Sequence, residues 1–258
     1  MVLTKKQISL FLLCTFIATF FLHGVLAILT NFDIVEFNSP FGMLIYVFGT
    51  LSPTITAYIV LKKYKLIGGM KSFLKIIFSF KAKPIFYVIS VFLLFSQFAY
   101  AILTLNTDIG WAWYMGITMF ILCIFDGGLE EVGWRYLLQP TLEKKHSFFI
   151  ATIITAVIWF LWHIPHFFIV GSGQDEMNFL MFLMVILSGS FALAVIYYVS
   201  KNVWLCVMIH ATYNTGTFIF PITKDFVTIS ISAACSIITS SVIVFFYAKF
   251  KGRNNELN

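Results

Sequence analysis

Apolar residues fill most of this chain in long stretches, which short polar and charged segments separate. Stretches close to the ~20 residues that a helix needs to cross a bilayer fall at about 8–30, 40–61, 84–105, 112–142, 147–170, 178–199, 203–221 and 226–249. The pattern therefore predicts an all-α polytopic membrane protein with eight transmembrane helices. A shorter segment, 68–83, has apolar residues on one side and lysines nearby, which is typical of a helix lying in the membrane interface.

The charged residues provide a test of this count, because each added or missing span would reverse the side of every later loop. With a cytoplasmic N-terminus, the basic residues that fall on the cytoplasmic side are Lys5, Lys6, Lys62, Lys63, Lys65, Lys71, Lys75, Lys81, Lys83, Lys144, Lys145, Lys201, Lys249, Lys251 and Arg253. Only Lys224 falls outside. The loops on the opposite side hold Asp33, Glu36, Asp108, Asp175, Glu176 and Asp225. We therefore predict a multi-pass protein of the cell membrane with both termini in the cytoplasm.

Composition supports a membrane protein and argues against a nucleic-acid-binding protein. Apolar residues make up 60% of the 258 residues and charged residues only 11%, which is far from the balance of a soluble domain. The net charge of +6 is spread along the edges of spans instead of forming one patch, so it does not indicate a nucleic-acid partner. No linker or internal repeat divides the chain, and residues 1–258 are predicted to form one integral membrane domain.

Three charges lie together within the fourth span, in the sequence Gly127-Gly128-Leu129-Glu130-Glu131-Val132-Gly133-Trp134-Arg135. Ionised groups in hydrocarbon cost several kcal/mol unless they are paired or hydrated, so such a cluster is a functional-site hypothesis. On a helix Glu131 and Arg135 are four residues apart and can pair, whereas Glu130 points about 100° away and is left for chemistry. A purely structural ion pair is the alternative for Glu131 and Arg135.

Imidazoles occur in two later spans. His163 and His166 lie in the fifth, and His210 shares a helix face with Asn214 in the seventh. At ~1.5 Å rise per residue, Glu130 and His163 would both lie roughly 20 to 27 Å from the turn near Lys145. The depth expected for His210 agrees less well with that of Glu130 and His163. We expect Glu130, His163, His210 and Asn214 to meet in a hydrated cavity, while His166 has an equally good explanation as a hydrogen-bonded structural residue.

The side chains that line such a cavity could hydrolyse an amide bond. A buried glutamate can act as general base towards water, a histidine can orient that water, and a His and Asn one turn apart can donate to a developing oxyanion. His163 and His210 with a carboxylate could instead bind Zn²⁺, although no H-E-x-x-H spacing is present. Other hypotheses are a Cys206 nucleophile activated by His210, ion or solute transport, and a non-catalytic immunity or binding protein.

These residues match a known pattern of Glu-Glu-x-x-x-Arg, an aromatic four residues before a His, and His-x-x-x-Asn. The chain resembles the CPBP family of intramembrane proteases, which includes type II CAAX prenyl proteases and the bacteriocin-processing Abi proteins. The resemblance covers about Asp126 to Asn214, within a motif region of about 112–221, and Ser52-Pro53-Thr54 is similar to a further pattern of the family. Trp159 stands where Phe is usual, and Tyr136 where Gly is common.

The resemblance implies an eight-helix bundle with a conical cavity that opens towards the cytoplasm. Glu130 would activate water with His163, His210 and Asn214 would stabilise the oxyanion, and Glu131 and Arg135 would shape the site. The family is commonly described as metalloproteases, but a glutamate-dependent mechanism has also been argued. The substrate would be a membrane-associated peptide or protein, and a bacterial-looking composition favours a bacteriocin or signalling precursor over a prenylated protein.

Overall fold

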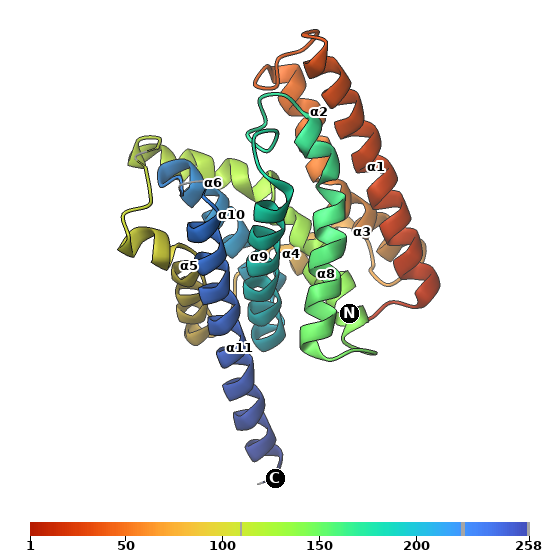
Figure 1. Cartoon of the computed structure of the whole chain (residues 1–258). Coiled ribbons are helices and arrows are strands. Elements are labelled where there is room, and N and C mark those ends of the chain that lie inside the picture. Colours follow the sequence, from red (N-terminus) through yellow and green to blue (C-terminus); the bar gives the residue numbers. More distant parts are fainter. Residues whose placement is uncertain (109, 223–224, 257–258) are drawn as a thin grey trace.

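The computed structural model describes residues 1–108, 110–222 and 225–256, apart from the side chains of 251–256. The predicted positions of Lys224, Lys251 and Arg253 lie outside these described residues and side chains. The fold is all-α, as predicted, and Figure 1 shows the long helices packed side by side. The α-helices are α1 (Lys5–Asn31), α2 (Pro40–Thr50), α3 (Ser52–Lys63), α4 (Met70–Ile77), α5 (Pro84–Leu103), α6 (Gly116–Phe125), α7 (Gln139–Leu142), α8 (Phe148–Trp162), α9 (Phe179–Ser200), α10 (Val203–Ile219) and α11 (Phe226–Glu256).

The chain is a polytopic integral membrane protein. Among the described residues, the helical segments long and apolar enough to cross a bilayer are Lys5–Asn31, Pro84–Leu103, Phe148–Phe168, Phe179–Ser200 and Phe226–Phe250. A sixth span results if α2 and α3, which meet at a bend of 45°, cross together. Helix α10 has 17 residues, about 26 Å of helix, so the predicted total of eight spans stays a prediction.

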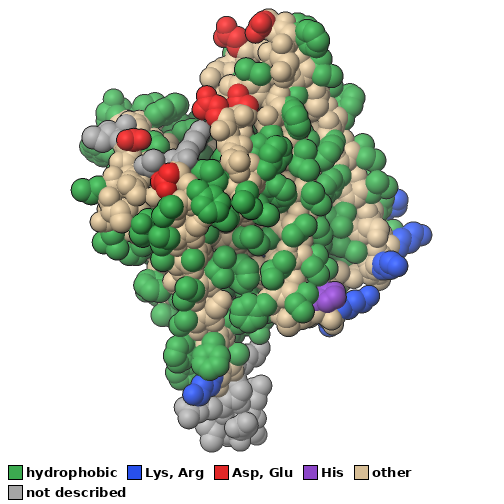
Figure 2. Space-filling view, in the orientation of Figure 1, with side chains coloured by type: hydrophobic (Ala, Val, Ile, Leu, Met, Phe, Trp, Pro, Cys, Tyr) green, Lys and Arg blue, Asp and Glu red, His purple; other side chains and the backbone are tan. Residues whose placement is uncertain are grey.

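The segment predicted to lie in the interface contains α4, a helix of 8 residues with Phe73 and Ile77 buried. At 1.5 Å per residue this helix is about 12 Å long, too short to cross the ~30 Å hydrocarbon core. Figure 2 shows apolar side chains over the middle of the visible face, with acidic side chains towards the top of the view and lysines along its lower right and bottom.

The predicted continuous helix over 112–142 is wrong. Helix α6 ends at Phe125, Gly127 takes a φ of +116°, and a short 3-10 helix, η2 (Gly128–Glu130), leads into the π-helix η3 (Val132–Leu138). A positive φ at Gly127 is accessible because glycine has no Cβ. Irregular backbone at membrane depth is tolerated where it is buried in protein or lines a cavity, so the break marks the position of a site.

Helix α3 supports this broken segment from one side. The Thr54 hydroxyl donates to the Leu129 carbonyl, which satisfies a backbone acceptor in η2. Gly133 lies so close to α1 and α3 that an added Cβ would be 2.8 Å from Phe11 Cζ and 2.8 Å from Pro53 Cβ. The Ser52-Pro53-Thr54 pattern therefore packs directly against the glutamate segment.

We predict that Gly133→Ala destabilises the protein, because the new methyl group must displace Phe11 or Pro53. Such overpacking typically costs about 1 to 3 kcal/mol, which should lower the midpoint of thermal unfolding in detergent by several degrees. Gly116→Ala is the matched control, since a Cβ there meets nothing within 4 Å. Equal midpoints for the two variants would contradict the close packing.

Candidate active site

A cavity of about 220 Å³ lies within the bundle, and four predicted residues from three separate segments line it. These are Glu130 from η2, His163 at the end of α8, and His210 and Asn214 from α10. The structure thus brings together the residues expected to meet, including His210, whose depth had agreed less well. The π-helix η3 lies between Glu130 and the turn near Lys145, so the comparison of depths, which assumed a regular α-helix, does not apply to Glu130.

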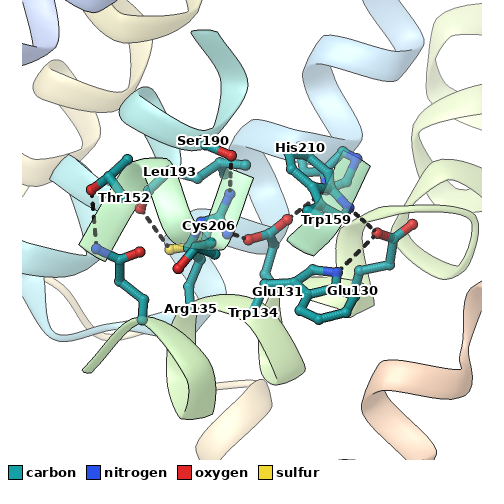
Figure 3. A network of polar contacts seen from close by, with 12 residues as sticks. Glu130, Glu131, Trp134, Arg135, Thr152, Trp159, Ser190, Leu193, Cys206 and His210 are labelled. Atoms are coloured by element: carbon teal, nitrogen blue, oxygen red, sulfur yellow. Dashed lines mark hydrogen bonds and ion pairs between the residues drawn. The ribbon is translucent and has the colours of Figure 1, made fainter. Parts of the chain in front are cut away.

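Glu130 is held by two tryptophans. Trp159 Nε1 donates to Glu130 Oε2 at 2.8 Å, and Trp134 Nε1 donates to the same oxygen at 3.2 Å (Figure 3). No donor among the described residues is within hydrogen-bond distance of Oε1. One carboxylate oxygen is therefore fixed by the protein, and the other remains available to a ligand or water. Trp159, noted above as unusual for the family, supplies one of the two donors.

Glu131 connects two segments, whereas sequence analysis predicted only one of its contacts. The predicted ion pair with Arg135 is confirmed, with Glu131 Oε2 at 3.4 Å from Arg135 Nε. In addition, His210 Nδ1 donates to Glu131 Oε1 at 2.8 Å, so η3 and α10 are joined through one carboxylate (Figure 3). Both carboxylate and guanidinium are fully buried. A buried ion pair of this kind orients its neighbours more than it adds stability.

Arg135 extends the same network to two more helices. Its Nη2 donates to Ser190 Oγ of α9 at 3.2 Å, and its guanidinium carbon lies 5.1 Å from the ring centroid of Trp159 on α8. The network joins η3, α8, α9 and α10 around the floor of the cavity. Glu131 and Arg135 do not line the cavity themselves, which fits the predicted role of shaping the site.

The hydrogen bond of His163 indicates which of its ring nitrogens carries hydrogen. Its Nδ1 donates to the Trp159 carbonyl at 2.8 Å. A neutral imidazole with hydrogen on Nδ1 has its lone pair on Nε2, so Nε2 can accept a hydrogen bond from water. His210 is fixed in the same way by Glu131, and its Nε2 becomes a donor when the ring is protonated.

Two nitrogen atoms converge beside Gly127. A Cβ built on Gly127 would lie 2.5 Å from Asn214 Nδ2 and 2.9 Å from His210 Nε2. Asn214 Nδ2 also donates to the Asp126 carbonyl at 3.3 Å, which fixes the orientation of its amide. The lack of a side chain at Gly127 leaves room for a ligand atom near both nitrogens.

Three residues next to the site, His23, Gln174 and Asp126, were not among the predicted site residues. His23, fully buried on α1, lies with its ring centroid 4.3 Å from that of His166, and His166 Nδ1 donates to Gln174 Oε1 at 3.0 Å. His166, Gln174 and Asp126 all line the cavity. His23 could have been found, because an imidazole within a predicted span is itself a signal. Gln174 lies in a loop and had no such signal.

The described residues do not fit a zinc centre. Among them, no group of three His, Cys, Asp or Glu side chains is arranged to hold a metal ion. His210 and His163 both donate from Nδ1, which leaves each Nε2 free, as in zinc-bound histidines, so the misfit lies in the number of ligands. The zinc ligands suggested by the sequence, His163 and His210, therefore lack a third partner, and we assign no step to a metal.

Cys206 is separate from the cavity. Its thiol is fully buried and lies 3.6 Å from the Leu193 carbonyl, to which it donates. The residues lining the cavity do not include Cys206. Its geometry is that of a buried, hydrogen-bonded thiol, which gives no support to the hypothesis of a cysteine nucleophile.

We predict that Glu131→Gln strongly destabilises the protein, because it leaves the Arg135 guanidinium buried without its carboxylate. Loss of one partner of a buried ion pair typically costs about 3 to 5 kcal/mol, measurable as a lower midpoint of thermal unfolding in detergent. Glu36→Gln removes an exposed carboxylate and is the control. An unchanged midpoint for Glu131→Gln would show that the ion pair does not hold the segment.

Comparison with known proteins agrees with the geometry. A sequence model of the Rce1-like type II CAAX prenyl endopeptidases matches residues 109–216, the region that contains Glu130, His163, His210 and Asn214. A curated relative, CAAX prenyl protease 2 of Methanococcus maripaludis, is 26% identical over 245 residues, which cover 86% of this chain and 88% of that protein. Together with the matching site residues, these similarities confirm the predicted resemblance to the type II CAAX prenyl endopeptidases, a family of proteases.

Proposed function

We propose that this protein is an intramembrane endopeptidase that uses Glu130 to activate water. The observation that carries the proposal is that Glu130, His163, His210 and Asn214 line one cavity of about 220 Å³. General-base catalysis requires a carboxylate within reach of water, and the free Oε1 of Glu130 meets that requirement. The resemblance to a protease family supports the same reaction class.

The reaction follows from the hydrogen-bonding state of each group. Glu130 takes a proton from water while His163 Nε2 accepts a hydrogen bond from the same water and orients it. The resulting hydroxide attacks the carbonyl carbon of the scissile amide. When the tetrahedral intermediate breaks its C–N bond, Glu130 returns the proton to the leaving nitrogen.

The oxyanion of that intermediate would form beside Gly127. Protonated His210 donates from Nε2, and Asn214 donates from Nδ2, to the carbonyl oxygen as it becomes negative. The hydrogen bond from Nδ1 of His210 to the Glu131 carboxylate holds the ring with Nε2 beside Gly127. Donors already oriented towards developing charge are among the largest contributions to catalysis.

For the substrate we propose a short membrane-associated peptide, such as a bacteriocin or signalling precursor. A cavity of about 220 Å³ is smaller than typical sites for drug-sized ligands, which have roughly 300 to 1,000 Å³. It would admit a narrow unfolded segment and exclude a folded domain. We further propose that the protein lies in the cell membrane with both termini in the cytoplasm, from the distribution of lysines.

Glu130→Gln is predicted to reduce peptide release by a factor of ~10² to 10⁴, because it keeps the shape of the side chain and removes the base. The assay uses membranes containing the protein and candidate precursors in prenylated and unprenylated forms. The unfolding midpoint should stay close to that of the wild type, and Glu36→Gln should cleave normally. A strong chelator is expected to leave cleavage unchanged.

Several results of that assay would contradict the proposal. Full cleavage by Glu130→Gln would remove the general base from the mechanism. Cleavage lost with chelator and restored by zinc would favour a metalloprotease. Cleavage of the prenylated form alone would favour a CAAX substrate, and failure of the wild type on every precursor would favour a binding or immunity protein.

Gly127→Ala is predicted to reduce peptide release by ~10² to 10³, comparable to the loss of one oxyanion donor. The new methyl group would occupy the space beside Asn214 Nδ2 and His210 Nε2. Gly171→Ala is the control for backbone strain, since Gly171 also has a positive φ, +84°, and a Cβ there meets only Phe37 at 3.5 Å. Equal rates for the two variants would show that the space beside Gly127 is not used.

A further inference from the structure

The two ends of the bundle carry opposite charge. At one end, hydrogen bonds join the N-terminal segment to Thr141 and join Asn202 to Ser79. The lysines of the loops around 62–83, 144–145 and 201 gather at this end, which we call the lysine end. At the other end, Asn31 Nδ2 donates to the Phe168 carbonyl at 2.7 Å. The loops of that end hold Asp33, Glu36 and Asp175, so we call it the acidic end. Figure 2 shows acidic side chains towards the top of the view.

The cavity extends from the catalytic residues towards the acidic end. Gln174, in the loop between the 3-10 helix η4 (Ile164–Phe168) and α9, and Phe218, in the last turn of α10, form part of its wall. A second cavity of about 410 Å³ shares Gln174 and Phe218 with the first and reaches Ser172 and Pro221 in the loops of the acidic end. The two cavities thus share walls and together lead from Glu130 to that end.

The path towards the lysine end is filled. Below the site, on the side of the lysine end, Leu137 and Leu138 of η3, Ile196 of α9 and Leu205 of α10 are all fully buried. Arg135 and Glu131 also have no solvent exposure. Among the described residues, the cavities that include Glu130 or share its walls lead towards the acidic end, and the cavity at the lysine end shares no lining residue with them.

We propose that substrate enters this site from the face of the membrane opposite the lysine-rich loops, which the positive-inside rule places outside the cytoplasm. That the entering molecule is a substrate rests on the proposed function, but the position of the entrance does not depend on cleavage. It differs from the cytoplasmic opening that the family resemblance implies. A cytoplasmic opening and two cytoplasmic termini cannot both hold in this fold.

The entrance also indicates what kind of segment it accepts. None of the described residues lining the second cavity carries a charge, and its walls include Met177, Phe182, Ile222 and Ile229. An uncharged, partly apolar segment of an exported or membrane-anchored peptide fits these walls. A cytoplasmic protein tail would be presented to the closed face instead.

Labelling of single cysteines with a membrane-impermeant maleimide tests the entrance directly. Ser172→Cys places a thiol at the second cavity, Asn38→Cys places one on the exposed loop before α2, and His146→Cys places one at the lysine end. The natural cysteines Cys14, Cys123, Cys206 and Cys235 lie within helices, and the wild type controls for them. Labelling is compared in intact cells and in inverted membrane vesicles.

We expect Ser172→Cys and Asn38→Cys to be labelled in intact cells, and His146→Cys only in inverted vesicles. The reverse pattern would overturn the proposal even if the protein cleaves peptides. Where the wild type cleaves, the bulky label on Ser172→Cys should reduce peptide release at least tenfold, and the label on Asn38→Cys should not. Correct sidedness without any wild-type cleavage would leave the entrance established and reject the protease function.

Discussion

The negative charge of a carboxylate that is buried away from water must be balanced by hydrogen-bond donors or positive charge. Glu131 has such partners. Its two oxygens face Arg135 and His210, at 3.4 and 2.8 Å. An unpaired charge at this depth would cost several kcal/mol, so the three side chains must stay together. Arg135 belongs to η3, His210 belongs to α10, and Arg135 also reaches Ser190 of α9, so the positions of three segments depend on this contact.

The break in the backbone at Gly127 serves the same site in another way. A regular helix through 112–142 would satisfy all its backbone groups internally and would direct Glu130 and Glu131 only by helical periodicity. The positive φ of Gly127 and the π-helical turn that follows instead place Glu130 in the cavity and Glu131 beneath it. Irregular backbone is costly in lipid because its polar groups lack partners. Here helix α3 supplies a hydrogen bond from Thr54 and packs closely against Gly133.

The two glutamates consequently have different surroundings although they are adjacent. Glu130 is held by neutral indole donors at one oxygen, whereas Glu131 is held by charged or chargeable partners at both. A base needs a free oxygen and a residue that shapes the site needs none, so the partners agree with the roles proposed for the two glutamates. The same reasoning explains why His210 is suited to donate and His163 to accept, since each has its Nδ1 bonded to a different kind of acceptor.

The sequence by itself determined the all-α membrane class, the pairing of Glu131 with Arg135, and the set Glu130, His163, His210 and Asn214. These follow from hydrophobic length, from i,i+4 spacing and from the high cost of polar groups in hydrocarbon, all of which are local or one-dimensional. Only the tertiary structure decided that Trp159 holds Glu130, that His210 binds Glu131, and that His23 packs against His166. Contacts between segments far apart in sequence leave no periodic signal. The direction of the cavity also required the structure, because it depends on which side chains fill the bundle on either side of the site.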